Sequence, residues 1–232
     1  MNFEDVMALP EKSRGEAAHE VASAGDNDAC FEYARLVFKD KYKGVKKAGQ
    51  TADEMKSEAR GDALRFLLEA AKRGHMPSIV EGQDAAFCGR FGAFNKVFCK
   101  VNYGKALEFL NVWLEHDISD EDKGLALLRK ATCLKLTNLS DKPWGEITEL
   151  WKQACELGGN NGVEASVRMG VHLFEGGKFE DAVEWLKRGD NISLSAVTHL
   201  MLIYKKHLPD PELHSHYVSK VKLMCQKKGK GE

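Results

Sequence analysis

The sequence of 232 residues lacks the features that mark exported, membrane-spanning or nucleic-acid-binding chains. No apolar run approaches the roughly 18 residues that a membrane-spanning helix needs. The first residues carry three acids before any base, which is the wrong charge for a secretory signal. The net charge of -1 leaves no excess of positive charge to attract a polyanion. We therefore predict a cytoplasmic protein that has no membrane partner and does not take nucleic acid as its main ligand.

Proline, paired cysteines and glycine-rich phosphate loops are also scarce. There are only five prolines, while Ala, Leu, Glu and Lys are abundant, and this composition favours helix. The six cysteines include no C-x-x-C pair, so we expect reduced, buried thiols rather than disulfides or a metal site. The C-terminal KKGKGE lacks the preceding strand and the following helix of a phosphate-binding loop.

Four segments of the chain repeat one apolar pattern. They begin at Ala63, Ala106, Ile147 and Ala182, so successive starts are 43, 41 and 35 residues apart. This spacing is typical of a repeat made of two helices. In each segment the first, fourth, fifth and eighth positions are apolar or small, which places them on one face of a helix. We predict that these segments are the second helices of successive helical hairpins.

The intervening segments have a different character, because each is built around a small residue that allows a neighbouring helix to approach closely. These residues are Ala34, Gly89, Ala131 and Gly170, and Met201 holds the equivalent place in a fifth segment. We predict that these segments are first helices. The predicted fold is an all-α, right-handed helical-hairpin solenoid of about ten or eleven helices. A single repeat domain is expected over 1–232, with an N-terminal capping helix in 1–25, hairpins in 26–205, and a C-terminal capping helix and basic tail in 206–232.

Helix boundaries are indicated by proline, capping residues and glycine. Every proline falls between predicted helices or in a first turn, where its missing N–H costs little: Pro10, Pro77, Pro143, Pro209 and Pro211. Capping boxes are predicted for the pairs Ser13 and Glu16, Thr51 and Glu54, and Ser78 and Glu81. C-terminal caps are predicted at Gly74, Gly158 and Gly159. Two longer connections, 39–58 and 93–103, enlarge the first and second hairpins and are candidates for shaping a binding surface.

The repeats resemble the Sel-one-like repeat, a relative of the tetratricopeptide repeat. FLLEAAKRGHMPS at 66–78 is similar to the paired Ala, charged residue and Gly that end that family's second helix. The stretch from Tyr42 through Gly44 and Val45 to Ala63 resembles its linker, and residues 149–189 follow the pattern more loosely. The third repeat departs from it, with Ile147 in place of Ala and no Gly beside Ala131. The resemblance covers about 26–205. It implies a helical-hairpin fold and work as an adaptor, scaffold or regulator; some bacterial members of the family are immunity proteins against toxins.

Side chains capable of chemistry do not converge in the sequence. His214 and His216 are two residues apart and so point to different sides of a helix, which is a poor geometry for a shared metal ion. His172 and His199 have no Cys or Asp partner near in sequence for a nucleophilic triad. Two lysine clusters, in 39–47 and 220–230, are interpreted as solvated faces. We predict no catalytic residue, no metal site and no cofactor.

The concave surface lined by first helices is the candidate partner-binding site. In repeats of this kind the residues one and four positions after the small residue point into it. The rule selects ten positions, and from these we predict seven partner-binding residues: Arg35, Phe38, Arg90, Thr132, Lys135, Phe174 and Lys205. Arg donates charge-assisted hydrogen bonds to carboxylates and Phe fills partner pockets. Charge reversal at Arg35 and Arg90 is predicted to weaken binding without lowering thermal stability.

These observations favour a non-catalytic protein–protein interaction module that presents a helical groove to a protein or peptide. An immunity or inhibitor protein that sequesters one toxin, effector or enzyme is the alternative. An RNA-associated repeat protein is a minor alternative. An enzyme would need convergent titratable groups in a pocket, which the sequence does not indicate.

Overall fold

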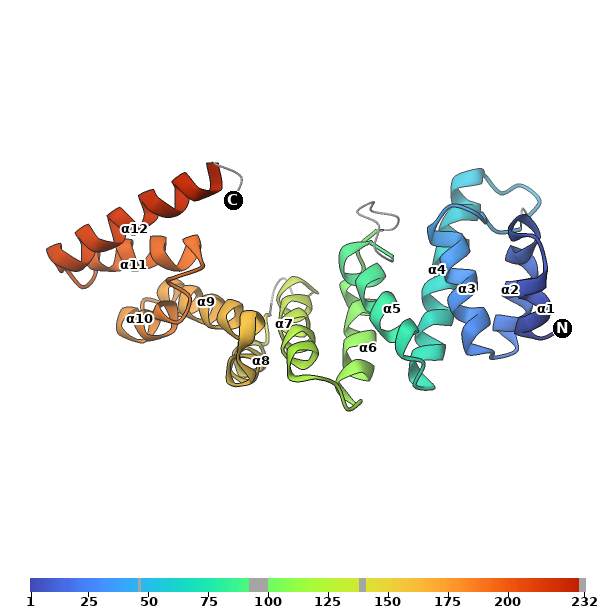
Figure 1. Ribbon diagram of the computed structural model, residues 1–232, viewed down its shortest axis with the longest axis horizontal. Helices are drawn as coiled ribbons and strands as arrows, with labels where there is room; N and C mark the ends of the chain where they lie inside the picture. Colours follow the sequence, from blue (N-terminus) through green and yellow to red (C-terminus); the bar gives the residue numbers. More distant parts are fainter. Residues whose placement is uncertain (46, 92–99, 138–140, 230–232) are drawn as a thin grey trace. The chain divides into compact units, whose positions relative to one another are not determined.

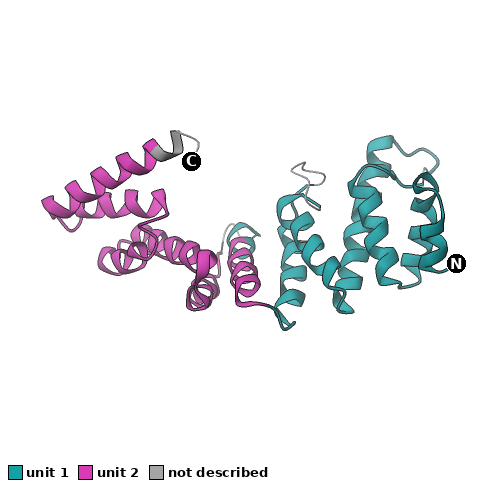
Figure 2. Cartoon of the chain, in the orientation of Figure 1, with its two compact units in different colours: residues 1–118, 133–141 teal, residues 119–132, 142–232 magenta. Residues whose placement is uncertain are grey.

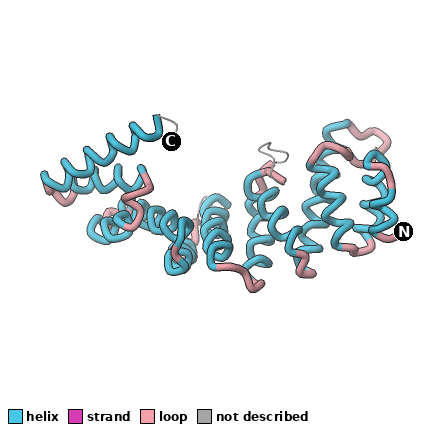
Figure 3. Tube along the Cα trace, viewed as in Figure 1, coloured by secondary structure: helices cyan, strands magenta, loops and turns pink. Residues whose placement is uncertain are grey.

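The computed structural model describes residues 1–45, 47–91, 100–137 and 141–229, with side chains as far as Gln226. The described residues form helices and their connections, without a strand (Figure 3). The predicted all-α class is therefore confirmed. The helices follow one another along the chain (Figure 1): α1 Phe3–Ala8, α2 Arg14–Ser23, α3 Asn27–Phe38, α4 Ala52–Lys72, α5 Met76–Cys88, α6 Tyr103–Leu114, α7 Asp120–Thr137, α8 Trp144–Leu157, α9 Gly159–Glu175, α10 Phe179–Lys187, α11 Leu194–Lys206 and α12 Pro211–Gly229.

The N-terminal segment accounts for the difference from the predicted helix count of ten or eleven. The predicted single capping helix in 1–25 is two α-helices, α1 and α2, separated by Pro10 and a 3₁₀ turn over Glu11–Ser13. Proline disfavours the helical conformation in the residue before it. Leu9 is accordingly extended, with ψ of 151°, and it ends α1.

The helices form two compact units, drawn in different colours in Figure 2. Unit 1 comprises 1–118 and 133–141, and unit 2 comprises 119–132 and 142–232, so the boundary crosses α7. In unit 1, each helix from α2 to α5 packs on the helix that follows it, and α4 also touches α6. In unit 2, each helix from α8 to α11 packs on the helix that follows it, and α9 also touches α11. Packing between chain neighbours, with contacts between alternate helices, is the arrangement of a helical solenoid. The predicted single domain and right-handed sense stay predictions.

The apolar faces predicted for the second helices are confirmed. In α4, Ala63, Phe66, Leu67 and Ala70 are all buried, and the equivalent positions of α6 and α8 are buried as well. In α10 Ala182 and Leu186 are buried, whereas Trp185 is partly exposed. The helical period therefore placed the side chains that fill the space between hairpins.

Small residues were predicted to lie within the first helices and to allow close approach of a neighbouring helix. Three of them do so, and a fourth does not. Ala34 and Ala131 are fully buried. Gly170 lies so close to α10 that an added Cβ would be 2.6 Å from Leu186 Cγ. The prediction that Gly89 lies within a helix is wrong, because α5 ends at Cys88 and Gly89 has a left-handed φ of 69°. Glycine adopts this conformation without the steric cost that a Cβ brings, which makes it a common helix terminator.

One of the three predicted capping boxes is present. The Thr51 side chain accepts from the Glu54 N–H, and the Glu54 carboxylate accepts from the Thr51 N–H at 2.8 Å. The prediction for Ser13 is wrong, since its side chain makes no capping bond. The prediction for Ser78 is also wrong: α5 begins two residues earlier, at Met76, because Pro77 fits in a first turn.

The predicted helix ends at Gly74, Gly158 and the prolines are confirmed, whereas the prediction of a C-terminal cap at Gly159 is wrong, because Gly159 is the first residue of α9. Gly74 follows α4 with φ of 85°, and Gly158 caps α8 with φ of 77°. The prolines lie in connections, at caps or in first turns. Of the two long connections, 39–58 is a loop over the described residues 39–45 and 47–51 and then forms the first two turns of α4. In the other, residues 92–99 lie outside the described residues.

The thiols among the described residues are free. Cys30 and Cys133 are buried, Cys88 and Cys155 are partly exposed, and Cys225 is exposed, while Cys99 is outside the described residues. None of the helices in the described ranges combines the length and apolarity needed to cross a bilayer.

Candidate functional site

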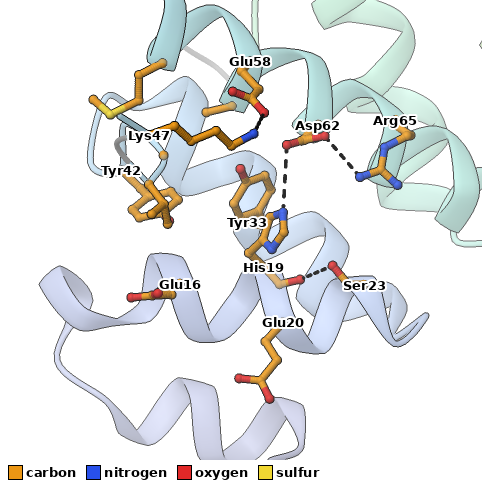
Figure 4. Close-up of a pocket in the computed structure, with 14 residues that line it drawn as sticks. Glu16, His19, Glu20, Ser23, Tyr33, Tyr42, Lys47, Glu58, Asp62 and Arg65 are labelled. Carbon is orange, nitrogen blue, oxygen red and sulfur yellow. Dashed lines mark hydrogen bonds and ion pairs between the residues drawn. The ribbon is translucent and has the colours of Figure 1, made fainter. Parts of the chain in front are cut away.

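A pocket of about 660 Å³ opens in unit 1 between α2, α3, α4 and the connection 39–51 (Figure 4). Helix α2 contributes Glu16, His19 and Glu20, and α3 contributes Tyr33. Helix α4 contributes a row of side chains along one face: Met55, Glu58, Ala59, Asp62 and Arg65. The volume falls within the range of small-molecule and side-chain binding pockets.

The connection 39–51 closes one side of this pocket and is held in place at three points. The ring of Tyr42 lies directly over Gly15 of α2, where any Cβ would overlap it. Gly44, with φ of 92°, brings the backbone against α4. A Cβ added at Gly44 would lie 3.2 Å from the Cβ of Ala59. Lys47 forms an ion pair with Glu58. The two glycines therefore permit the close approaches that shape the pocket.

Charges around the pocket are unbalanced. Four carboxylates line it, from Glu16, Glu20, Glu58 and Asp62, against two basic side chains, from Lys47 and Arg65, which is an excess of two negative charges.

The two carboxylates on α4 already have cationic partners. Asp62 Oδ1 lies 3.1 Å from Arg65 Nη2, and Asp62 Oδ2 lies 3.9 Å from His19 Nε2. The hydrogen bond from Lys47 holds the pKa of Glu58 below its usual range, assisted by Gln50. Glu16 and Glu20 are exposed and pair with no cation among the described residues. The uncompensated charge thus belongs to α2.

Aromatic rings form the base of the pocket. The Tyr33 ring makes edge contacts with His19 at 5.2 Å, Phe66 at 5.4 Å and Tyr42 at 5.8 Å between centroids. Tyr33 is 1% exposed, and its hydroxyl has no hydrogen-bond partner among the described residues. Burial, followed by the charge of Asp62, raises the pKa of Tyr33. The neutral hydroxyl can therefore both donate and accept a hydrogen bond.

Four of the seven predicted partner-binding residues lie in unit 1, and two of them, Arg35 and Phe38, have little freedom to meet a partner as predicted. Arg35 is bonded to the buried Glu32, at 2.7 Å between Nη2 and Oε1, and to Glu11 at 3.5 Å. Phe38 is 1% exposed, and its ring packs on Phe91 at 5.1 Å. Arg90 is exposed but follows the end of α5 instead of lying on a helix.

The ion pairs of Arg35 bear on the prediction that reversing its charge would weaken binding without lowering thermal stability. Reversing its charge would place a carboxylate against Glu32, which is 5% exposed. Stability would fall as well as any binding, because a buried charge would lose its partner.

The other four predicted residues lie on α7, α9 and α11. Thr132 is partly exposed, and its hydroxyl accepts a hydrogen bond of 2.8 Å from Arg168 Nη1 on α9. Phe174 on α9 packs edge-on against His199 of α11, 5.0 Å between centroids. Lys205 is exposed on α11, and Lys135 is partly exposed on the part of α7 that belongs to unit 1. We call Thr132, Arg168, Phe174 and His199 the first-helix surface.

Sequence reasoning missed the pocket and part of the first-helix surface. His19, Tyr33 and Asp62 come from three helices, and no spacing rule connects them. The unusual length of the connection 39–58 was the one sequence feature that could have indicated the pocket, since part of this segment lines it. Arg168 lies two residues before the small position Gly170 and so fell outside the rule that selected positions after it.

The two regions offer different chemical groups to a ligand or partner. The pocket offers carboxylate and phenol oxygens as acceptors. The first-helix surface offers guanidinium, hydroxyl, imidazole and phenyl groups. Among the residues whose placement is described, no group of three or more His, Cys, Asp or Glu could hold a metal ion. No protein-family model matches the sequence, and no curated protein is similar to it in sequence.

Proposed function

We propose that this chain is a non-catalytic protein-interaction module, an adaptor or scaffold of the Sel-one-like kind that works in the cytoplasm. Its first-helix surface binds a protein or peptide partner. The arginine contacts carboxylates of the partner, and the phenyl and imidazole rings contact apolar side chains.

The contact between alternate helices in unit 2 carries this proposal. α9 packs on α11, and Phe174 and His199 meet there. On its other side α9 is joined to α7 by the bond from Arg168 to Thr132, and the Asn161 amide donates to the Glu121 carbonyl at 3.1 Å. Helix α9 thus makes side-chain contacts with both of its neighbouring first helices. Because these contacts hold the side chains before any partner arrives, little ordering entropy is lost on binding.

Substitution of an arginine inside this surface, matched by one outside it, tests the proposal. Arg168→Ala removes a side chain that is 38% exposed and bonded to Thr132 and Glu164. Arg188→Ala is the control, because Arg188 is equally held within unit 2, stacked 4.4 Å over Trp185 beside the second helix α10. Partners captured from a source-cell lysate by the tagged native chain should be lost with Arg168→Ala and retained with Arg188→Ala.

The pattern of captured molecules separates the possible roles. Several salt-sensitive proteins lost with Arg168→Ala support an adaptor, and one stoichiometric protein that survives moderate salt supports an inhibitor or immunity protein. Equal capture by the two variants contradicts the first-helix surface as the binding site. Recovery of nucleic acid alone contradicts the protein-interaction module itself.

A further inference from the structure

We propose that the pocket in unit 1 is a second binding site, which takes an organic cation carrying N–H donors, either an alkylammonium or a guanidinium group. It lies between α2, α3, α4 and the connection 39–51, whereas the first-helix surface lies in unit 2. The two assignments therefore do not depend on each other.

The charge of the lining selects the sign of the ligand. Glu58 and Asp62 are already neutralised by Lys47 and Arg65, while Glu16 and Glu20 have no cationic partner among the described residues. A cation entering the pocket would meet these two carboxylates without displacing an existing ion pair. An anion would meet an excess of two negative charges.

The Tyr33 hydroxyl provides an observation independent of the carboxylates. This side chain is 99% removed from solvent, yet its hydroxyl lines the pocket and is bonded to no described residue. The oxygen is not among the fully buried polar atoms that lack a partner, so it is open to the pocket, where a ligand can donate an N–H to it. This unpartnered hydroxyl, open to the pocket on a residue that is otherwise buried, thus indicates a place for a ligand donor.

The aromatic lining fits the same class of ligand. Tyr33 and Tyr42 present rings to the pocket, with His19 beside Tyr33. A cation near an aromatic face gains electrostatic energy that a neutral group does not gain. The alkyl chain of a polyamine or of an arginine side chain would lie against the apolar atoms of Met55 and Val45, which also line the pocket.

Calorimetric titration of the purified full-length chain tests the proposal. Spermidine represents a free polyamine, and an end-blocked Gly-Arg-Gly-Arg-Gly peptide represents an arginine side chain of a protein. Tetramethylammonium is the control cation, because it has the charge but no N–H donor. The proposal predicts saturable binding of spermidine or the peptide at one site, and much weaker binding of tetramethylammonium.

Two variants with matched controls place the ligand in the pocket. Tyr33→Phe removes only the unpartnered hydroxyl, and Glu16→Gln removes one uncompensated charge. Each should weaken binding by about three- to tenfold, the usual effect of one hydrogen bond or one close charge. Tyr103→Phe and Glu115→Gln, both in unit 1 outside this lining, should leave the affinity unchanged. Circular dichroism should show the same helix content for all four variants.

Each outcome decides the assignment. Binding of spermidine that both pocket variants weaken identifies a free polyamine as the ligand, and the same result with the peptide alone identifies a protein side chain. Pocket variants that bind as tightly as the native chain overturn the proposal. So does equal affinity for tetramethylammonium, or no saturable binding of either probe. None of these results requires a captured protein partner, so failure here leaves the proposed function standing.

Discussion

The carboxylate of Glu32 accepts two hydrogen bonds from the guanidinium of Arg35, one helical turn later on α3. The distances are 2.5 Å from Nε to Oε2 and 2.7 Å from Nη2 to Oε1. Glu32 is 5% exposed, and its only other cationic neighbour within ion-pair distance among the described residues is Arg14, at 3.8 Å. Arg35 therefore supports the fold of unit 1, whatever it contributes to a partner.

Removing this guanidinium should destabilise the chain. Arg35→Ala would leave the Glu32 carboxylate buried with only the longer Arg14 contact, which costs about 2 to 3 kcal/mol of unfolding free energy. Urea unfolding followed by helical circular dichroism measures the loss. Arg60→Ala is the control, because Arg60 on α4 makes no ion pair with a described residue and should change stability little. Equal unfolding midpoints for the two variants would refute the structural role of Arg35.

The capping box at the start of α4 predicts a dependence on pH. The Thr51 N–H, and then its hydroxyl, donate to the Glu54 carboxylate and hold the pKa of Glu54 below its usual value. Because the folded-state pKa is lowered, the stabilising contribution is present above the ordinary glutamate pKa. It is lost as the pH falls through the lowered folded value.

Nuclear magnetic resonance titration can follow Glu54 in the native chain and in Thr51→Ala. The native pKa should lie below that of a free glutamate, and the substitution should move it upward. Thr51→Ala should also lower the unfolding free energy by about 1 kcal/mol at neutral pH, as loss of an N-cap does. An unshifted Glu54 in the native chain would show that the capping box does not form.

Two glycines in helices should respond to alanine in opposite directions. At Gly170 a Cβ would lie 2.6 Å from Leu186 Cγ and 3.1 Å from its backbone nitrogen, so Gly170→Ala should cost about 1 to 3 kcal/mol. At Gly61, in the exposed part of α4, a Cβ meets nothing within 4 Å. Gly61→Ala should stabilise the chain by about 0.5 to 1 kcal/mol, because alanine loses less backbone entropy on folding. Thermal unfolding of both variants tests the pair, and a stabilising Gly170→Ala would contradict the close packing of α9 on α10.

The thiols should differ in reactivity according to burial. Cys225 is exposed on α12, whereas Cys30 is fully buried and burial raises its pKa. The thiolate is the reactive form of cysteine. Cys30 is therefore protected both because a reagent cannot reach it and because its raised pKa keeps it protonated. In a chain with Cys99→Ser, a disulfide-exchange reagent should modify Cys225 first and Cys30 only after unfolding. Adding Cys225→Ser should remove the fastest phase; rapid modification of Cys30 in the folded chain would argue against its burial.

The sequence determined the parts of this structure that depend on neighbours along the chain. Apolar residues at helical spacing predicted the buried faces of α4, α6 and α8, because the period of 3.6 residues brings them to one side of each helix. Thr51 and Glu54 predicted the start of α4, and Gly74 its end, because caps bond to backbone groups within one turn. The all-helical class followed from the same local signals.

Only the tertiary structure decided which side chains meet across helices. Phe38 and Arg35 were both expected to face a partner. Phe38 is instead buried in the core, and Arg35 neutralises the buried carboxylate of Glu32. Tyr33 and Asp62, on α3 and α4, line one pocket although 29 residues separate them. Periodicity shows that a side chain lies on a given face of its helix, but which neighbour covers that face depends on the packing of separate helices. Burial and charge pairing arise from that packing, so the pocket and the first-helix surface became visible only in the fold.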